Sequence, residues 1–273
     1  MTASTIISTQ PGARFDGFGR ATLGALALAR KDLAEWGHGP RAFVVFAVTA
    51  LFMVLSAANS WINAWIIANL PTEGEVARPI SMVPLDNVLA AVSSQIFVIA
   101  AIFATMSLLV AERDHGTLAW IASKPVARGG IWLSKAASAS AVLWVAAFLA
   151  PMAIVLAVVT VLYGAPPILP ILGIVIGAGA AIAFFVAVVL AASTVVSSQP
   201  AVAAIGLAAM FVPSIVAGVV PFAIEPYLPT SILGWATGLG AGADVGIATP
   251  IAWALSMVVI AVLAMRRMEA LEL

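Results

Sequence analysis

Residues 168–196 read ILPILGIVIGAGAAIAFFVAVVLAASTVV, and no charged residue interrupts them. About 20 mostly apolar residues are enough for a helix to cross the roughly 30 Å hydrocarbon core of a bilayer. This stretch therefore predicts a membrane-spanning helix, and the chain holds more stretches of the same kind. Together they make six predicted spans, namely Phe43–Ile67, Asn87–Val110, Ala136–Leu162, Ile168–Val196, Ala201–Val220 and Ile247–Met265.

The composition of the whole chain agrees with an all-α integral membrane protein. Apolar residues make up 63% of the 273 residues, charged residues only 9%, and the mean hydropathy is +1.13. Soluble domains carry roughly 25% charged residues because their surfaces face water. The net charge of +0 argues against a nucleic-acid partner, since no excess positive charge is available to phosphates. The chain contains no cysteine, which excludes disulfides and thiolate chemistry.

The distribution of Lys and Arg predicts the orientation of the spans. All but one of the 12 basic residues fall in segments that six spans would place on one side, and only Arg78 falls on the other. Cytoplasmic loops are the ones enriched in Lys and Arg. We therefore expect both chain ends in the cytoplasm (N-in, C-in), in a multi-pass protein of the plasma or inner membrane.

The spans offer no energy source of their own. They contain no Asp, Glu, Lys, Arg or His, the residues that usually mark proton relays and ion pathways within membranes. The Gly-Lys-Ser/Thr of a phosphate-binding loop and the His-Glu-x-x-His of a zinc site are both absent. We predict no catalytic residue, no metal site and no cofactor in this chain. A sodium-coupled secondary carrier stays open, because broken helices can bind sodium through backbone carbonyls.

The most informative segment is the loop 111–135 between the second and third spans. From Glu112 to Lys135 it reads ERDHGTLAWIASKPVARGGIWLSK. Helical spacing puts Leu118, Ile121 and Ala122 on one face of a short helix that Pro125 would end, and Arg128–Gly130 predicts a turn. From spacing alone, this segment is a helix lying on the membrane surface or an ordinary loop.

The same loop resembles that of type-2 ABC transporter permeases. The matching pattern is an acidic–basic–acidic cluster followed by Gly-Thr-Leu, then Pro-Val-x-Arg, then a Lys at the start of the next span. The chain departs from it at Ala119, where the family usually has an acidic residue. The resemblance implies a coupling helix that docks on a separate ATPase subunit through Glu112, Arg113, Asp114, His115, Gly116, Thr117, Leu118, Pro125 and Arg128.

The resemblance also implies partners and an activity. Two cytoplasmic ABC ATPase subunits would hold ATP and magnesium, and a second copy or a related permease subunit would complete the transporter within the lipid bilayer. The implied function is ATP-driven transport, by preference export. A non-transporting membrane scaffold or an immunity protein of the same fold stays open as an alternative.

The remaining segments complete the predicted organisation. We expect a disordered N-terminus at 1–17, an amphipathic connecting helix at 18–40, and a six-span domain at 41–273. Residues 221–246 are apolar but broken by prolines and glycines, so they are too interrupted for a lipid-exposed span. They resemble the segment before the last span of type-2 exporters, and this resemblance implies exofacial re-entrant helices here. Gly173 and Gly177 in the fourth span predict close helix packing.

Polar residues near the outer ends of the first two spans are candidates for a substrate route. They are Asn59, Asn63, Ser93 and Gln95. The alternative is that Asn lies at headgroup depth and that Ser and Gln join helices, and we favour this alternative.

Overall fold

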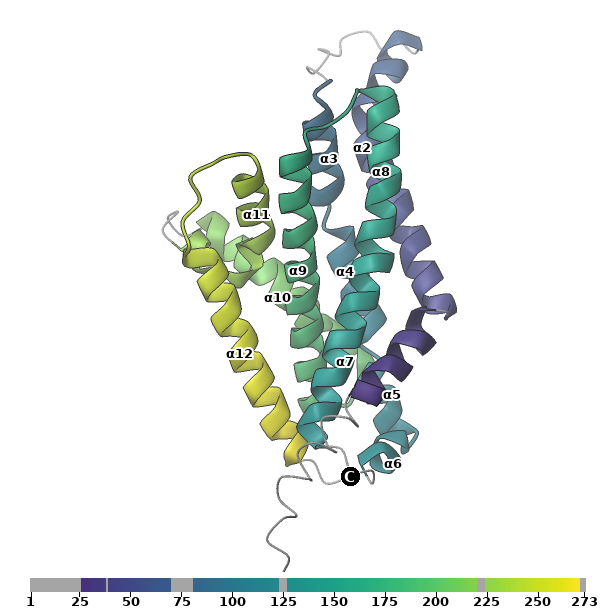
Figure 1. The fold of residues 1–273 in the computed structure, drawn as a ribbon, viewed down its shortest axis with the longest axis vertical. Helices are drawn as coiled ribbons and strands as arrows, with labels where there is room; N and C mark the ends of the chain where they lie inside the picture. The colour runs from purple at the N-terminus through teal and green to yellow at the C-terminus, as the bar shows by residue number, and fades with distance from the viewer. Residues whose placement is uncertain (1–25, 38, 70–80, 123–126, 220–223, 271–273) are drawn as a thin grey trace, which may run out of the picture.

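The computed structural model describes residues 26–37, 39–69, 81–122, 127–219 and 224–270. These residues form helices, turns and short connections, and none of them is in a strand. The long helices run side by side as an elongated bundle (Figure 1). The predicted disorder of residues 1–17 lies outside the described residues.

Within the described residues, six helical segments are long and apolar enough to cross a membrane, as predicted. The chain is therefore a multi-pass membrane protein. The first span is α2 (Pro40–Asn69) and the second is α3 (Pro84–Ser93), α4 (Ile96–Thr105) and α5 (Leu108–Asp114) in succession. The third joins α7 (Arg128–Leu143), η1 (Trp144–Leu149) and α8 (Ala150–Leu162). The last three are α9 (Ile168–Val195), α10 (Gln199–Val219) and α12 (Ala248–Glu269).

Two spans carry interruptions that apolar length does not reveal. Gln95 adopts a left-handed conformation with φ 49° and separates α3 from α4. In the third span, η1 is a π-helical turn in which the Ala150 amide donates to the Val145 carbonyl. Pro151 follows directly, and proline has no amide to continue the α-helical pattern. The wider turn absorbs the mismatch that this proline creates.

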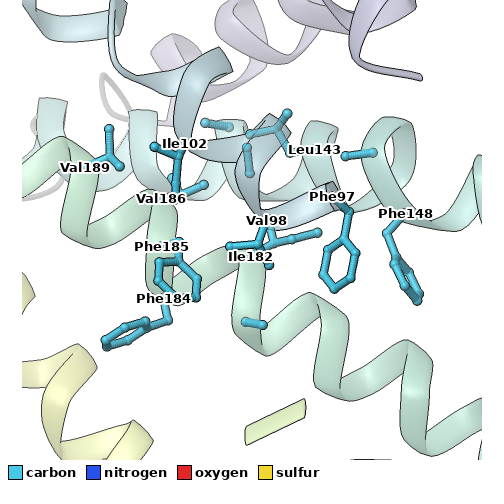
Figure 2. Packing of buried hydrophobic residues seen from close by; sticks show 14 of the residues in the cluster. Phe97, Val98, Ile102, Leu143, Phe148, Ile182, Phe184, Phe185, Val186 and Val189 are labelled. Carbon is cyan, nitrogen blue, oxygen red and sulfur yellow. The ribbon is translucent and has the colours of Figure 1, made fainter. Parts of the chain in front are cut away.

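The core surrounds α9, the most buried of the spans. Phe97 of α4 meets Phe148 of η1 edge-on with ring centroids 5.0 Å apart, and Ile182 of α9 lies fully buried in the same cluster (Figure 2). Lipid tails are as apolar as these side chains, so close packing rather than exclusion of water holds the helices together.

The segment before the last span folds into short helices. They are η2 (Glu225–Tyr227), η3 (Pro229–Ser231) and α11 (Ile232–Gly240). A methyl group added to Gly173 would lie 2.2 Å from the Ala236 carbonyl oxygen of α11. Gly173 and Gly177 therefore permit backbone contact between α9 and α11, which confirms their predicted packing role.

Two details concern the helix 26–37 and the start of α7. Residues 26–37 of the predicted connecting helix are helical, with Leu26 and Leu33 exposed and Trp36 against the core. The predicted turn at Arg128–Gly130 is wrong, because α7 already begins at Arg128. Gly129 lies against α12, where an added methyl group would meet the Met265 side chain at 3.2 Å. The glycine thus serves helix packing instead of a turn.

Candidate coupling site

The segment from α5 to α6 (Thr117–Ala122) forms a tight helix–turn–helix at one end of the bundle. Gly116 ends α5 in a left-handed conformation with φ +69°, and its amide donates to the Arg113 carbonyl at 3.0 Å. Glycine is the default residue for such a helix end, since it has no Cβ to clash. The Thr117 hydroxyl donates to the Glu112 carbonyl at 3.1 Å, which fixes the start of α6.

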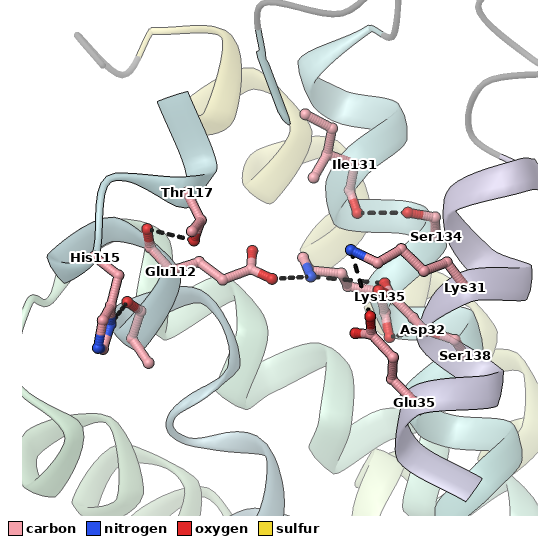
Figure 3. Close-up of polar contacts among 11 residues, drawn as sticks. Lys31, Asp32, Glu35, Glu112, His115, Thr117, Ile131, Ser134, Lys135 and Ser138 are labelled. Atoms are coloured by element: carbon pink, nitrogen blue, oxygen red, sulfur yellow. Dashed lines mark hydrogen bonds and ion pairs between the residues drawn. The ribbon is translucent and has the colours of Figure 1, made fainter. Parts of the chain in front are cut away.

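A buried lysine joins this segment to the rest of the protein. Lys135 of α7 lies between Glu112 of α5 and Asp32 of the helix 26–37 (Figure 3). Its Nζ is 2.6 Å from Glu112 Oε1 and 3.6 Å from Asp32 Oδ2, and its side chain is only 4% exposed. A buried charge needs partners of opposite sign, because removal from water is otherwise very unfavourable. These three residues, the charge clamp, therefore connect three separate elements.

Burial has a measurable consequence for one acid of the charge clamp. Desolvation raises the pKa of the Asp32 carboxyl above its usual 3.8, although the attraction of the Lys135 ammonium acts in the opposite direction. The Asp32 side chain is 13% exposed, and that of Glu112 is 26% exposed. Asp32 therefore holds its negative charge less readily in the folded protein than in water.

Three further contacts join predicted docking residues to the rest of the protein. Arg113 Nη2 donates to the Ser193 carbonyl near the end of α9 at 2.5 Å. Leu118 of α6 is 1% exposed and belongs to the hydrophobic core. Arg128 donates to the Glu269 carbonyl at the end of α12, at 3.5 Å. Glu112, Arg113 and Leu118 thus make contacts within the protein itself.

The other predicted docking residues form an outward face. Asp114, His115, Gly116 and Thr117 are exposed. The His115 ring is held over its own helix by a 2.5 Å contact between Nδ1 and the Ala111 carbonyl. These residues offer a small polar surface on a rigid support, and Pro125 lies outside the described residues.

The candidate route residues separate into two groups. Ser93 and Gln95 line a cavity of about 440 Å³ between the α3–α4 break, α10 and the short helices before the last span. Ser214, Glu225 and Thr237 add further polar groups to its wall. Asn59 and Asn63 are exposed on α2 and do not line this cavity.

Sequence reasoning missed Asp32 as a site residue. Its position on the predicted connecting helix was evident, but nothing local indicated that Lys135, far along the chain, would lie against it. Among the described residues, no group of three or more His, Asp or Glu could hold a metal ion.

Comparison with known families agrees with this geometry. A family model described as "ABC-2 family transporter protein" matches residues 26–239, well over half of the chain. The match runs from the helix 26–37, through the coupling segment, to α11. No curated protein and no solved structure matches the chain.

Proposed function

Because the chain belongs to the ABC-2 family of transporter proteins, we propose that it is the membrane subunit of an ATP-driven exporter. Two separate cytoplasmic ATPase subunits would bind ATP and magnesium and supply the energy. A second copy of this chain, or a related subunit, would form the other half of the membrane domain.

The observation that carries this proposal is the division of the coupling segment into an anchored side and an exposed side. Glu112, Arg113 and Leu118 tie the segment to α7, α9 and the core, while Asp114–Thr117 remain exposed. A movement imposed on the exposed side would pass to the spans, because packed elements move as rigid bodies. A buried ion pair such as that of Lys135 and Glu112 is not expected in an ordinary surface loop.

Charge placement supports the proposed orientation. The segments that carry the described Lys and Arg are the helix 26–37, the starts of α2 and α7, and the ends of α5 and α12, and they lie in the half of the bundle that carries α5 and α6 (Figure 1). The start of α3, which carries Asp86, lies toward the other end. Positive charge is retained on the cytoplasmic side. The coupling segment and the ATPase subunits would then meet in the cytoplasm.

The cavity beside Gln95 is the best candidate for the outer part of the export route. Irregular backbone within a membrane is tolerated where it lines a cavity. In many transporters, broken helices form the site that binds the substrate. Ser93, Gln95 and Thr237 would offer hydrogen bonds to a passing solute. Asn59 and Asn63 would join the route only where a second subunit covers the later part of α2, beyond the residues near its start.

The proposal is tested by isolating the full chain from its native membranes together with any ATPase that accompanies it. Asp114→Lys should reduce ATPase co-purification and chain-dependent ATP turnover by at least about tenfold, because it reverses a charge on the docking face. Glu112→Gln should leave the ATPase bound but weaken its coupling to transport, since the docking face keeps its residues and loses its anchor.

Asp244→Lys is the matched control, because it makes the same charge change on an exposed residue at the opposite end. ATP turnover that is equal with and without the chain, or equal in Asp114→Lys and Asp244→Lys, would refute ATPase docking at this site.

A further inference from the structure

A groove of about 720 Å³ runs along the outside of the bundle between α2 and α4. Its apolar wall is made by residues of these two helices, and its polar residues gather near the end that carries α5. The groove is therefore amphipathic along its length. Its volume lies in the range of sites that hold molecules of a few dozen atoms.

The shape of the groove follows from side-chain size. Ala100 and Ala104 lie one helical turn apart on α4, and their small side chains form the floor of the groove. Val44 and Val48 form one wall, and Phe103 rises beside them. Val44, Val48 and Phe103 are 57%, 41% and 48% exposed, so the described residues of the chain do not cover this apolar surface. Hydrocarbon chains are its natural neighbours at membrane depth.

Arg41 lies at the polar end of the groove, in an electrostatic setting that favours an anion. It sits in the first turn of the 30-residue helix α2, which has no acidic residue there. The positive end of the helix dipole normally attracts negative side chains, so a cation at this point adds to an unbalanced positive field. Three carboxylates share a neighbouring cavity with Arg41, namely Asp32, Glu35 and Glu112. Each has another cation beside it, because Asp32 and Glu112 both pair with Lys135 and Glu35 pairs with Lys31.

Further polar residues surround the same point. Ser107, His115 and Gln199 line the groove together with Arg41. Hydroxyl, imidazole and amide groups can all donate hydrogen bonds to phosphate oxygens. An anionic head at Arg41, continued by an apolar chain along α2 and α4, would match the groove from one end to the other.

We propose that this groove binds an anionic phospholipid from the leaflet at the basic end of the bundle. The phosphate contacts Arg41, and one acyl chain lies over Ala100 and Ala104 between Val48 and Phe103. This lipid is distinct from the transported substrate, and its binding requires neither ATP nor the ATPase subunits.

The test measures lipids retained by the purified full chain after equilibration in detergent micelles with equal amounts of phosphatidylglycerol and phosphatidylcholine. Native mass spectrometry counts each lipid per protein. The wild type should retain phosphatidylglycerol in preference. Arg41→Gln should lower that retention about fivefold and leave phosphatidylcholine unchanged, because one basic contact to an anionic headgroup is lost.

Matched variants separate this site from general effects. Arg267→Gln removes an exposed positive charge from the end of α12, outside the groove, and should leave retention unchanged. Ala104→Phe fills the floor and should lower retention of both lipids, whereas Ala47→Phe on an exposed part of α2 outside the groove should not.

Three results would overturn the proposal. The first is equal retention of the two lipids by the wild type, and the second is unchanged retention in Arg41→Gln. The third is a disulfide-linked pair formed by Val48→Cys under mild oxidation, which would identify a second copy as the occupant. Because the chain has no native cysteine, that link can arise only at the introduced position. Arg41 is exposed, so its substitution tests the site even where Ala104→Phe fails to fold.

Discussion

Lys135 is the residue on which the cytoplasmic side of the proposed transporter depends most. Replacing it with Met would leave Glu112 and Asp32 partly buried without their shared counter-ion. Removal of one member of a buried ion pair typically destabilises a protein by about 3–5 kcal/mol. Because the Glu112 side chain is still 26% exposed, we expect about 3 kcal/mol for Lys135→Met, seen as a lower Tm in detergent.

Lys31→Met is the control for that experiment. Lys31 pairs with Glu35 one turn away at 3.5 Å, but both side chains are more than half exposed. Exposed pairs of this kind contribute only about 0.3–0.5 kcal/mol. Equal losses in the two variants would show that the charge clamp does not hold its three elements together.

Replacing Asp32 should raise the stability of the protein, whereas replacing Lys135 should lower it. Since burial raises its pKa above 3.8, the folded state disfavours ionised Asp32 relative to the unfolded state. The stabilising contribution of this carboxyl is thus complete below pH 3.8 and is lost as the pH rises through the raised pKa. Asp32→Asn cannot ionise, so it should melt above the wild type at pH 7.

The difference between Asp32→Asn and the wild type should shrink as the pH falls toward 4. Lys135 still has Glu112 as a partner in this variant, and its attraction for Asp32 is already included in the direction of the pKa shift. Melting curves recorded between pH 4 and 7 decide the point, and a lower Tm for Asp32→Asn at pH 7 would contradict it.

The turn between α5 and α6 should lose stability when Gly116 is replaced. At Gly116 an added methyl group meets no atom within 4 Å, so only the left-handed backbone opposes a larger residue. Gly116→Ala should destabilise the turn by about 1 kcal/mol. Hydrogen exchange should become faster at the amides of residues 115–117, while Gly246→Ala, which has open space and no left-handed backbone, should leave exchange unchanged.

The contact between α9 and α11 gives a second prediction about elements. A methyl group at Gly173 would overlap the Ala236 backbone, which cannot rotate away as a side chain can. Gly173→Ala should therefore lower stability by about 1–3 kcal/mol and displace α11. Gly234→Ala, on a part of α11 with open space, is the control. Equal Tm values for these variants would mean that the two helices are not packed backbone to backbone.

Elements differ in how far sequence can predict them. Apolar length predicts the six spans, because the thickness of the bilayer sets a minimum length for every crossing helix. Pro151 gives a local signal for the π-helical turn before it, whereas the left-handed Gln95 depends on packing between α3, α4 and their neighbours. The coupling segment was recognised from its residues, but its division into anchored and exposed sides depends on Lys135 and Ser193, which only the tertiary fold brings to it.

The orientation of the whole molecule is the last prediction, and it depends on charge rather than on any single contact. The described basic residues gather in the half of the bundle that carries α5 and α6, and we expect the membrane to retain that half in the cytoplasm. Because the chain has no cysteine, single introduced cysteines report which side each residue faces. Thr117→Cys should react with a membrane-impermeant maleimide only after the cells are permeabilised, and Asn63→Cys should react in intact cells. The cysteine-free wild type sets the background. Labelling of Thr117→Cys in intact cells would show that the topology is the reverse of the predicted one. The coupling segment would then lie outside the cell, where no cytoplasmic ATPase could reach it.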